Sequence, residues 1–481
     1  MSDPRTPLVP DDGWRRLHPL TPLARGWKVV AVILALIAQQ RGTALFSDGL
    51  PSREEAFITL AVLAGAALLA GLYGLVAWRC AAYQVDRDTL RLHYGVVFRQ
   101  QRHARLDRLQ AVDVVRPLLG RFLGLAEVRL EVAGGKDSAI VLSLLRESDA
   151  VELRNVLLAR AAGVHYDGDV APQAPETEVL QVPVSRVIGS MLLTLPSMLL
   201  LFVVVTAVTA VTVTREFAAL AIVASVAIGI VGTLWGRFTS RFGFRVATSP
   251  DGIRLHHGLL TTRAQTVPPG RVQAIRLHQP LMWRRRDWWT MQVNVAGYGG
   301  GHGMGESGGT NAEEENVLLA VGTREQALLV LRLALPGLED EDGQADDTRA
   351  AVVAGLDGTD EDTGFVVAPR ASRWLDPIGW RRHGVNVLDD VVLLRRGRFG
   401  RELDVVPHAR TQSLGVRQGP LQRRLALASF HMHSTAGPVH PTVMHLCSDD
   451  AAALLVAQAE RARVARAASG DGDQGRWMEG R

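Results

Sequence analysis

One motif occurs three times in this chain, and its repetition constrains the fold more than any other feature. Each copy begins with a glycine that is followed, thirteen residues later, by an Arg-x-Gln triplet. A Pro-Leu pair then stands seventeen residues before a second glycine. The three copies begin at Gly95, Gly258 and Gly397. Equal spacing at three places indicates one fold unit used three times, so function must be sought in a repeated module.

Nine polar residues recur with the motif and are the candidate binding residues. They are Arg108, Gln110 and Arg121 in the first copy, Arg271, Gln273 and Arg284 in the second, and Arg410, Gln412 and Arg424 in the third. Recurrence shows that the module needs them, and repeated positions are usually architectural, which favours a role in fixing a loop. The alternative is contact with anionic lipid headgroups, which gains roughly 1 kcal/mol for each Lys or Arg.

The hydrophobic residues, 47% of the chain, are concentrated in a few long runs. Residues 56–78, 187–214 and 217–236 carry no charge. About twenty apolar residues are needed to cross a bilayer as a helix, and each run is that long. Residues 27–46 form a weaker fourth run that we expect to complete the first hairpin. The sequence therefore predicts four transmembrane helices in two hairpins, 27–78 and 187–236.

Arginines flanking these runs predict the orientation. They cluster before residue 27, after residue 78 and after residue 236, while the two hairpin loops are poorer in them. The positive-inside bias then places both termini and all three modules in the cytoplasm of a bacterial cell, below its plasma membrane. Cys80 and Cys447 are the only cysteines, which is typical of a reducing compartment.

The expected order along the chain is tail, hairpin, module, hairpin, module, linker, module and tail. The predicted bounds are a tail 1–26, hairpin 27–78, first module 79–163, linker 164–186, hairpin 187–236, second module 237–337, acidic disordered linker 338–370, third module 371–468 and flexible tail 469–481. Within a module, alternating stretches such as Val128, Leu130 and Val132 predict strands with one buried face. A closing amphipathic helix follows each set, with Ser148, Thr323 and Ser448 as expected N-caps.

Strands closed by one C-terminal helix describe a pleckstrin-homology-like (PH-like) β-barrel. The first module's RLQAV and RPLLGRFLGLAEVRLEVAGG, next to a membrane hairpin, resemble the bacterial PH domain family, type 2. The third module's WLDPIGWRRHGV is similar to members of this family, and the triple arrangement resembles its YdbT-type membrane proteins. The resemblance implies a PH-like fold and a membrane location, and it brings no settled activity.

A run of tryptophans and arginines in the second module, WRRRDWW, has three interpretations. Trp283, Trp288 and Trp289 are expected at a membrane interface, where Trp is enriched. Stacking on single-stranded nucleic acid is a less favoured alternative. The third interpretation places two of the three in the module core.

Other motifs give catalysis no support. Gly303 to Gly308 matches G-x-G-x-x-G but lies in a long Gly-rich stretch rather than at the opening of a helix. His431 and His433 are interpreted as exposed strand residues rather than metal ligands. We therefore expect no catalytic residues, no metal and no cofactor.

The sequence thus predicts a non-catalytic inner-membrane protein whose three modules form a cytoplasmic platform for a protein partner or anionic lipid. Envelope homeostasis is the role that the family resemblance suggests. The alternative is a regulatory or structural component of a membrane transport complex. The bilayer is the expected partner, nucleic acid is not expected, and a protein partner in the membrane and an oligomer both remain open.

Overall fold

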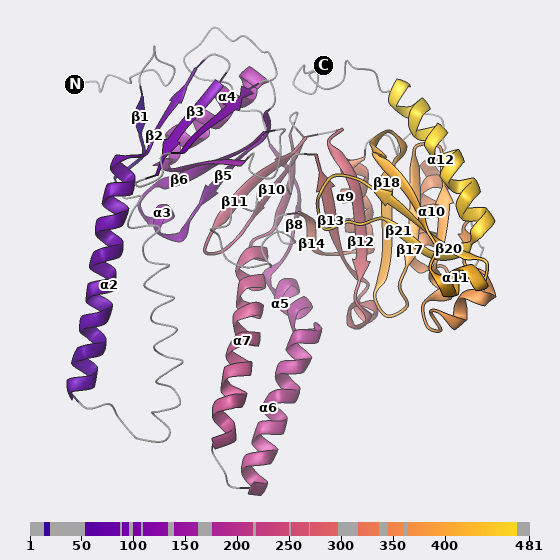
Figure 1. Cartoon of the computed structure of the whole chain (residues 1–481), viewed down its shortest axis with the longest axis horizontal. Coiled ribbons are helices and arrows are strands. Elements are labelled where there is room, and N and C mark those ends of the chain that lie inside the picture. The colour runs from indigo at the N-terminus through magenta and orange to yellow at the C-terminus, as the bar shows by residue number, and fades with distance from the viewer. Residues whose placement is uncertain are drawn as a thin grey trace.

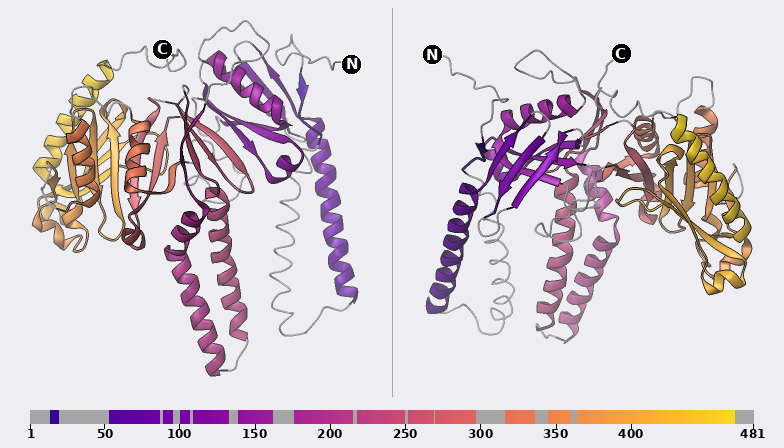
Figure 2. Two further views of the ribbon diagram at one scale, coloured as in Figure 1. Left: turned by 180° about the vertical axis from the view of Figure 1, so that it is seen from behind. Right: turned by 45° about the horizontal axis from the view of Figure 1, so that its top comes forward.

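The computed structural model describes residues 14–19, 53–86, 89–95, 100–106, 109–132, 139–161, 176–214, 218–249, 252–268, 270–296, 316–335, 345–359 and 364–468. These residues form three sandwich-type modules in a row, and long helices project from one side of that row (Figure 1). The other two views show the same arrangement (Figure 2).

Module one combines four N-terminal strands, three further strands and a closing helix. Its elements are β1 (Arg15–Arg16), α2 (Arg53–Arg79), β2 (Ala82–Val85), β3 (Thr89–Tyr94), β4 (Gln100–Arg105), β5 (Leu109–Arg116), α3 (Leu118–Phe122), β6 (Leu125–Val132), β7 (Ala139–Arg146) and α4 (Glu147–Ala161). The expected tail 1–26 therefore contributes a strand. Arg15 pairs with Tyr83, and the Trp78 indole donates to the carbonyl of Leu17.

Module two repeats this order, with the long helices α6 and α7 between its first two strands. Its elements are β8 (Thr177–Gln181), α5 (Val184–Leu192), α6 (Leu195–Thr214), α7 (Ala218–Arg241), β9 (Arg245–Ser249), β10 (Gly252–His257), β11 (Thr262–Val267), β12 (Val272–Gln279), η2 (Leu281–Arg286), β13 (Trp288–Val295), β14 (Val317–Thr323) and α9 (Arg324–Ala334). Thr323 caps α9 through a reciprocal capping box with Gln326, as its N-cap signature predicts.

Module three begins with a helix that lies within the predicted disordered linker 338–370. Its elements are α10 (Ala345–Asp357), β15 (Val366–Val367), η4 (Arg370–Trp374), η5 (Trp380–Arg382), β16 (Gly384–Val387), β17 (Val391–Arg396), β18 (Arg401–Pro407), η6 (His408–Arg410), β19 (Ser413–Arg417), α11 (Pro420–Arg424), β20 (Leu427–His433), β21 (Thr442–Cys447) and α12 (Ser448–Ala468). Helix α10 forms within the acidic stretch because one of its faces is apolar and can pack on the core. Ala351, Val352 and Leu356 of that face are buried in the core shared by modules two and three.

The sheets are open and run across the module boundaries, so the expected closed β-barrels are not present. The strand orders are β1-β2-β3-β4, then β7-β6-β5-β11-β10-β9-β8, then β14-β13-β12-β18-β17-β16-β15, and finally β19-β20-β21. Each seven-stranded sheet joins the last three strands of one module to the first four of the next. Antiparallel pairing of β5 with β11 and of β12 with β18 forms the two junctions.

The repeated glycines sit at the turns between the third and fourth strands of each module. Gly95, Gly258 and Gly397 have φ of 109°, 111° and 80°, where an L side chain is strained. A Cβ on Gly258 would lie 2.0 Å from the Thr261 carbonyl oxygen, and one on Gly397 would lie 2.0 Å from that of Gly400. The turn geometry therefore requires the glycine that starts each motif copy.

The expectation of four membrane-spanning helices is supported at one place in the described residues. Leu195–Val213, within α6, has the length and mean hydropathy, 2.2, of a span. Helices α2 and α7 extend over two of the other expected spans, while residues 27–46 lie outside the described residues. The predicted run 187–214 is divided, because α5 ends at Leu192 before α6 begins.

Candidate functional site

The helical hairpin of module two and the short helix α3 lie at one end of the first seven-stranded sheet. The hairpin connects β8 to β9, and Gln181 at the end of β8 pairs with Arg245 at the start of β9. At the other side of the sheet, Arg116 ends β5 opposite Thr262, the first residue of β11. Helix α3 follows Arg116 directly, so it lies at the end of the sheet that carries the hairpin.

The second seven-stranded sheet repeats this arrangement without long helices. Gln279 ends β12 opposite Arg401, and η2 follows. At the same end, Val367 of β15 pairs with Gly384 of β16, and residues 368–383 connect these two strands. Residues 368–383 therefore occupy in module three the place that α2 occupies in module one and the α6–α7 hairpin in module two, between the first two strands.

A direct contact ties this end of the second sheet to the base of the hairpin. The Trp283 indole of η2 donates a 3.0 Å hydrogen bond to the Ser190 carbonyl of α5, immediately before α6 begins. Helices α3 and α11 also lie on the side of the row from which α2, α6 and α7 project (Figure 1). We call α3, η2, α11 and residues 368–383 together the hairpin-side rim.

The hairpin-side rim carries both exposed apolar side chains and exposed arginines. The apolar ones are Phe122, Leu281, Met282, Trp374, Ile378 and Leu421, of which Phe122 is 81% and Trp374 72% exposed. The exposed arginines are Arg121, Arg285, Arg286, Arg370, Arg373, Arg381, Arg423 and Arg424. The Arg373 guanidinium lies 5.3 Å from the centre of the Trp374 ring. Large apolar side chains among cations are typical of a surface that meets lipid headgroups.

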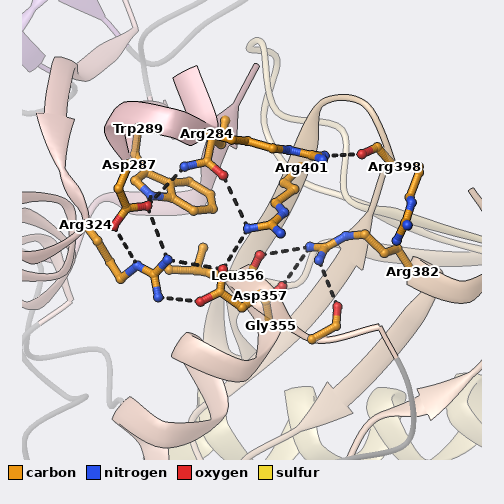
Figure 3. A network of polar contacts seen from close by, with 12 residues as sticks. Arg284, Asp287, Trp289, Arg324, Gly355, Leu356, Asp357, Arg382, Arg398 and Arg401 are labelled. Carbon is orange, nitrogen blue, oxygen red and sulfur yellow. Dashed lines mark hydrogen bonds and ion pairs between the residues drawn. The ribbon is translucent and has the colours of Figure 1, made fainter. Parts of the chain in front are cut away.

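An arginine-rich network lies behind the rim where modules two and three meet (Figure 3). Arg284 of η2 donates to the carbonyls of Arg398 and Phe399 in the β17–β18 turn. Asp357, at the end of α10, accepts from Arg324 and, at 2.7 Å, from Arg401. These bonds hold η2, α10 and the β17–β18 turn together.

Arg382 completes the network by capping α10. It is buried and donates to the carbonyls of Gly355, Leu356 and Gly358 at 3.0, 3.2 and 2.8 Å. Burial, and then the charges of Arg401, Arg395 and Arg284, lower the pKa of Arg382 to about 9. Burial is the main cause of this shift, and the neighbouring arginines add to it. The network holds Arg284, Arg324, Arg382 and Arg401 against two carboxylates, Asp287 and Asp357, so it carries more positive than negative charge (Figure 3).

Two of the Arg-x-Gln residues lie against backbone in the described structure. The Gln273 amide is buried and donates to the Arg271 carbonyl at 3.3 Å. Arg410 of module three lies against the backbone of module two, since its Nη2 is 3.2 Å from where a Cβ on Gly270 would be. Gln412 is exposed. Arg108 and the side chain of Gln110 lie outside the described residues.

The third repeated arginine differs between modules. Arg121 and Arg424 are exposed on the rim, whereas Arg284 is engaged with backbone carbonyls. The members of this set that the structure describes therefore do not converge on one site. The rim residues that sequence reasoning missed, above all Trp374 and Ile378, stand in WLDPIGWRR, whose mixture of tryptophan and arginine is the signal that could have identified them.

The three tryptophans of module two lie in its core. Trp283, Trp288 and Trp289 are 2%, 9% and 0% exposed. Trp283 and Trp288 pack edge to face, and the Trp289 indole donates to Asp287 at 2.9 Å. Burial of this degree leaves these rings little surface for a membrane interface, so the core interpretation describes them. Leu281 and Met282, which precede Trp283, are exposed instead.

His431 and His433 of β20 contact neighbouring side chains of the sheet and each other. Nδ1 of His431 lies 3.2 Å from the Thr442 hydroxyl, and the rings of His431 and His433 stack at 6.5 Å. No group of three or more His, Cys, Asp or Glu side chains within the described ranges is arranged to hold a metal ion.

Four strands followed by three strands and a closing helix occur three times along the chain, and this order defines a protein built of PH-like modules. A family model for the bacterial PH domain matches residues 29–161, 192–328 and 330–462. These matches extend over most of the chain, which therefore belongs to the bacterial PH domain family. Neither a curated protein nor a solved structure shows significant similarity to it.

Proposed function

We propose that this chain is a non-catalytic plasma-membrane protein of the YdbT type, whose three cytoplasmic modules form a platform held against the inner leaflet. The hairpin-side rim would contact anionic headgroups, and the opposite side would receive a protein partner in envelope homeostasis. One observation carries the proposal: residues 368–383 replace a hairpin by topology and still expose Trp374 and Ile378 beside arginines.

The projecting helices support a membrane location. Leu69 and Tyr73 of α2 are 68% and 65% exposed, and Phe202 of α6 and Ile228 of α7 are 67% and 72% exposed. Contiguous apolar surface of this extent is rare on soluble proteins. Since the helices project from the side that carries the rim, inserting them in a bilayer would bring the rim to the headgroups (Figure 1).

The electrostatics of the rim favour an anionic surface. Its exposed side chains include eight arginines, and in the network beside them Arg284, Arg324, Arg382 and Arg401 outnumber Asp287 and Asp357. Each such cation gains roughly 1 kcal/mol near an anionic leaflet and loses it at high salt.

We expect a dye on the rim to report lipid charge. The full chain, carrying Ile378→Cys with Cys80→Ser and Cys447→Ser, would be labelled and placed in nanodiscs containing headgroup-quenching lipid. Quenching should be greater with phosphatidylglycerol than with phosphatidylcholine. Arg373→Gln with Arg381→Gln should cost about 2 kcal/mol, roughly a thirtyfold shift toward the undocked state.

The matched control is Arg461→Gln, which removes an exposed arginine from α12, outside the rim. It should leave quenching unchanged. Equal and weak quenching in both lipids would show that the rim does not meet headgroups, and the proposal would then fail in its lipid part.

A further inference from the structure

Among the edge strands of the described sheets, β4 and β19 are the two whose counterparts in the repeat pair at the internal junctions. β4 ends the sheet of module one, and β19 ends the last sheet of module three. By position in the repeat, β4 corresponds to β11 and β18, and β19 corresponds to β5 and β12. These are the strand types that pair at the two internal junctions.

The two internal junctions use the same register. At the first, Ala264 pairs with Val114, and at the second, Leu403 pairs with Leu277. Ala264 and Leu403 each stand six residues after their motif glycine, and Val114 and Leu277 six after their motif arginine. The chain therefore contains one junction geometry, built twice from different side chains.

The ends of the row carry the same two positions, each with a strand partner on one side only. Six residues after Gly95 is Gln101 of β4, and six after Arg410 is Val416 of β19. Gln101 is exposed, and Val416 is 36% exposed, whereas Val114 and Leu277 at the internal junctions are 3% and 0% exposed. Exposed edge strands present backbone donors and acceptors to another chain.

We propose that a second copy of this chain adds its β4 to β19 in the register of the internal junctions. Gln101 of one copy would then lie opposite Val416 of the other, Gln100 opposite Arg417, and Arg102 opposite Gly415. No like charges stand directly opposite in this register, and neither strand contains a proline that would remove a ladder donor.

The contact joins different surfaces, so it leaves one β4 and one β19 free after every addition. Such head-to-tail interfaces build rings or open rows rather than closed dimers. The internal junctions keep α2 and the α6–α7 pair on one side of the row, so copies joined in the same way would present all their long helices to one plane (Figure 1). The inference concerns self-association and does not depend on lipid contact by the rim.

Cysteine cross-linking tests the register. In the full chain with Cys80→Ser and Cys447→Ser, Gln101→Cys combined with Val416→Cys should give a ladder of dimers and larger species on oxidation in membranes. Each single variant should give nothing larger than a dimer. The matched control combines Gln101→Cys with Ser413→Cys, three residues out of register on the same strand, and should give no ladder.

Charge reversal provides a second measurement that does not depend on cysteine chemistry. Gln101→Lys with Val416→Lys places two ammonium groups opposite each other and should raise the dissociation constant roughly fivefold, measured by sedimentation in detergent. Gln101→Glu with Val416→Lys should restore wild-type association. A wild-type protein that stays monomeric at every concentration, together with a double-cysteine variant that forms no ladder, would overturn the proposal.

Discussion

Gly258→Ala is expected to lower the free energy of unfolding by about 3 kcal/mol or more, and Gly397→Ala by a similar amount. Holding a non-glycine residue at such a φ costs of order 1–3 kcal/mol. The new methyl group would also lie 2.0 Å from a carbonyl oxygen that belongs to the same tight turn, so the turn must open. The measurement is thermal unfolding of the full chain in detergent, followed by fluorescence at a fixed scan rate.

The control for both variants is Gly229→Ala in α7. No atom lies within 4 Å of the position that its Cβ would take, and the residue is in a helix, where alanine is favoured by up to about 1 kcal/mol. Gly229→Ala should therefore leave the midpoint unchanged or raise it. Unfolding midpoints for Gly258→Ala that match wild type would mean that the turn differs from the one described.

Arg276→Leu is expected to destabilise the junction of modules two and three by about 3 kcal/mol, because it leaves the buried Asp404 carboxylate without its main partner. Arg276 on β12 donates to Asp404 on β18 through two hydrogen bonds of 2.7 and 3.1 Å, and Asp404 is 1% exposed. Burial lowers the pKa of Arg276, but the hydrogen bonds and charge of Asp404 outweigh that effect and raise it. Hydrogen exchange of the β12 and β18 amides measures the loss locally.

Two further variants separate the buried pair from a general charge effect. Replacing both partners, Arg276→Met with Asp404→Leu, should recover most of the lost stability, since no isolated charge stays buried. Arg463→Gln breaks the exposed Arg463–Glu460 pair on α12 and should leave the junction amides unchanged. Fast exchange across β12 and β18 in the double variant would assign the junction's strength to the ion pair itself rather than to burial.

The repeat could be found from the sequence because its glycines serve a backbone requirement. Gly95, Gly258 and Gly397 occupy equivalent turns with positive φ. Because such a turn favours glycine over any other residue, the glycine recurs at the same place in each copy of the motif. Period-two alternation indicated the strands for a similar reason, since one face of each sheet is buried. The Thr323 cap was likewise readable, because a capping box is local in sequence.

The junctions could not be predicted in this way. Strands of neighbouring modules are joined by backbone hydrogen bonds, which any side chain allows, so the pairing of β5 with β11 leaves no residue signature. Nor does the Arg276–Asp404 pair repeat, since Asp113 and Gly415 stand at the equivalent places in modules one and three. Sequence reasoning therefore identified the modules and missed the continuous sheets.

Helix α10 and the rim show a second limit. Ten acidic residues in the stretch 339–362 favoured disorder, yet three apolar residues on one face are enough to pack α10 against the core. The rim depends on which end of a sheet each connection occupies, and that follows only from strand register. Arg121 and Arg424 were identified by recurrence, but their place beside Phe122 and Leu421 was not.

The position of the second helical hairpin, between β8 and β9, sets an order of events during synthesis. β8 leaves the ribosome before the apolar helices, and its partner β9 follows after them. The strands β8 and β9 can pair only when the intervening segment has turned back on itself. If the helices enter a bilayer as proposed, their insertion and the folding of module two become one coupled process. If the hairpin did not form, β8 would lack its partner β9 and would expose the backbone of an unpaired strand. Cellular quality control would then meet an incompletely folded module two.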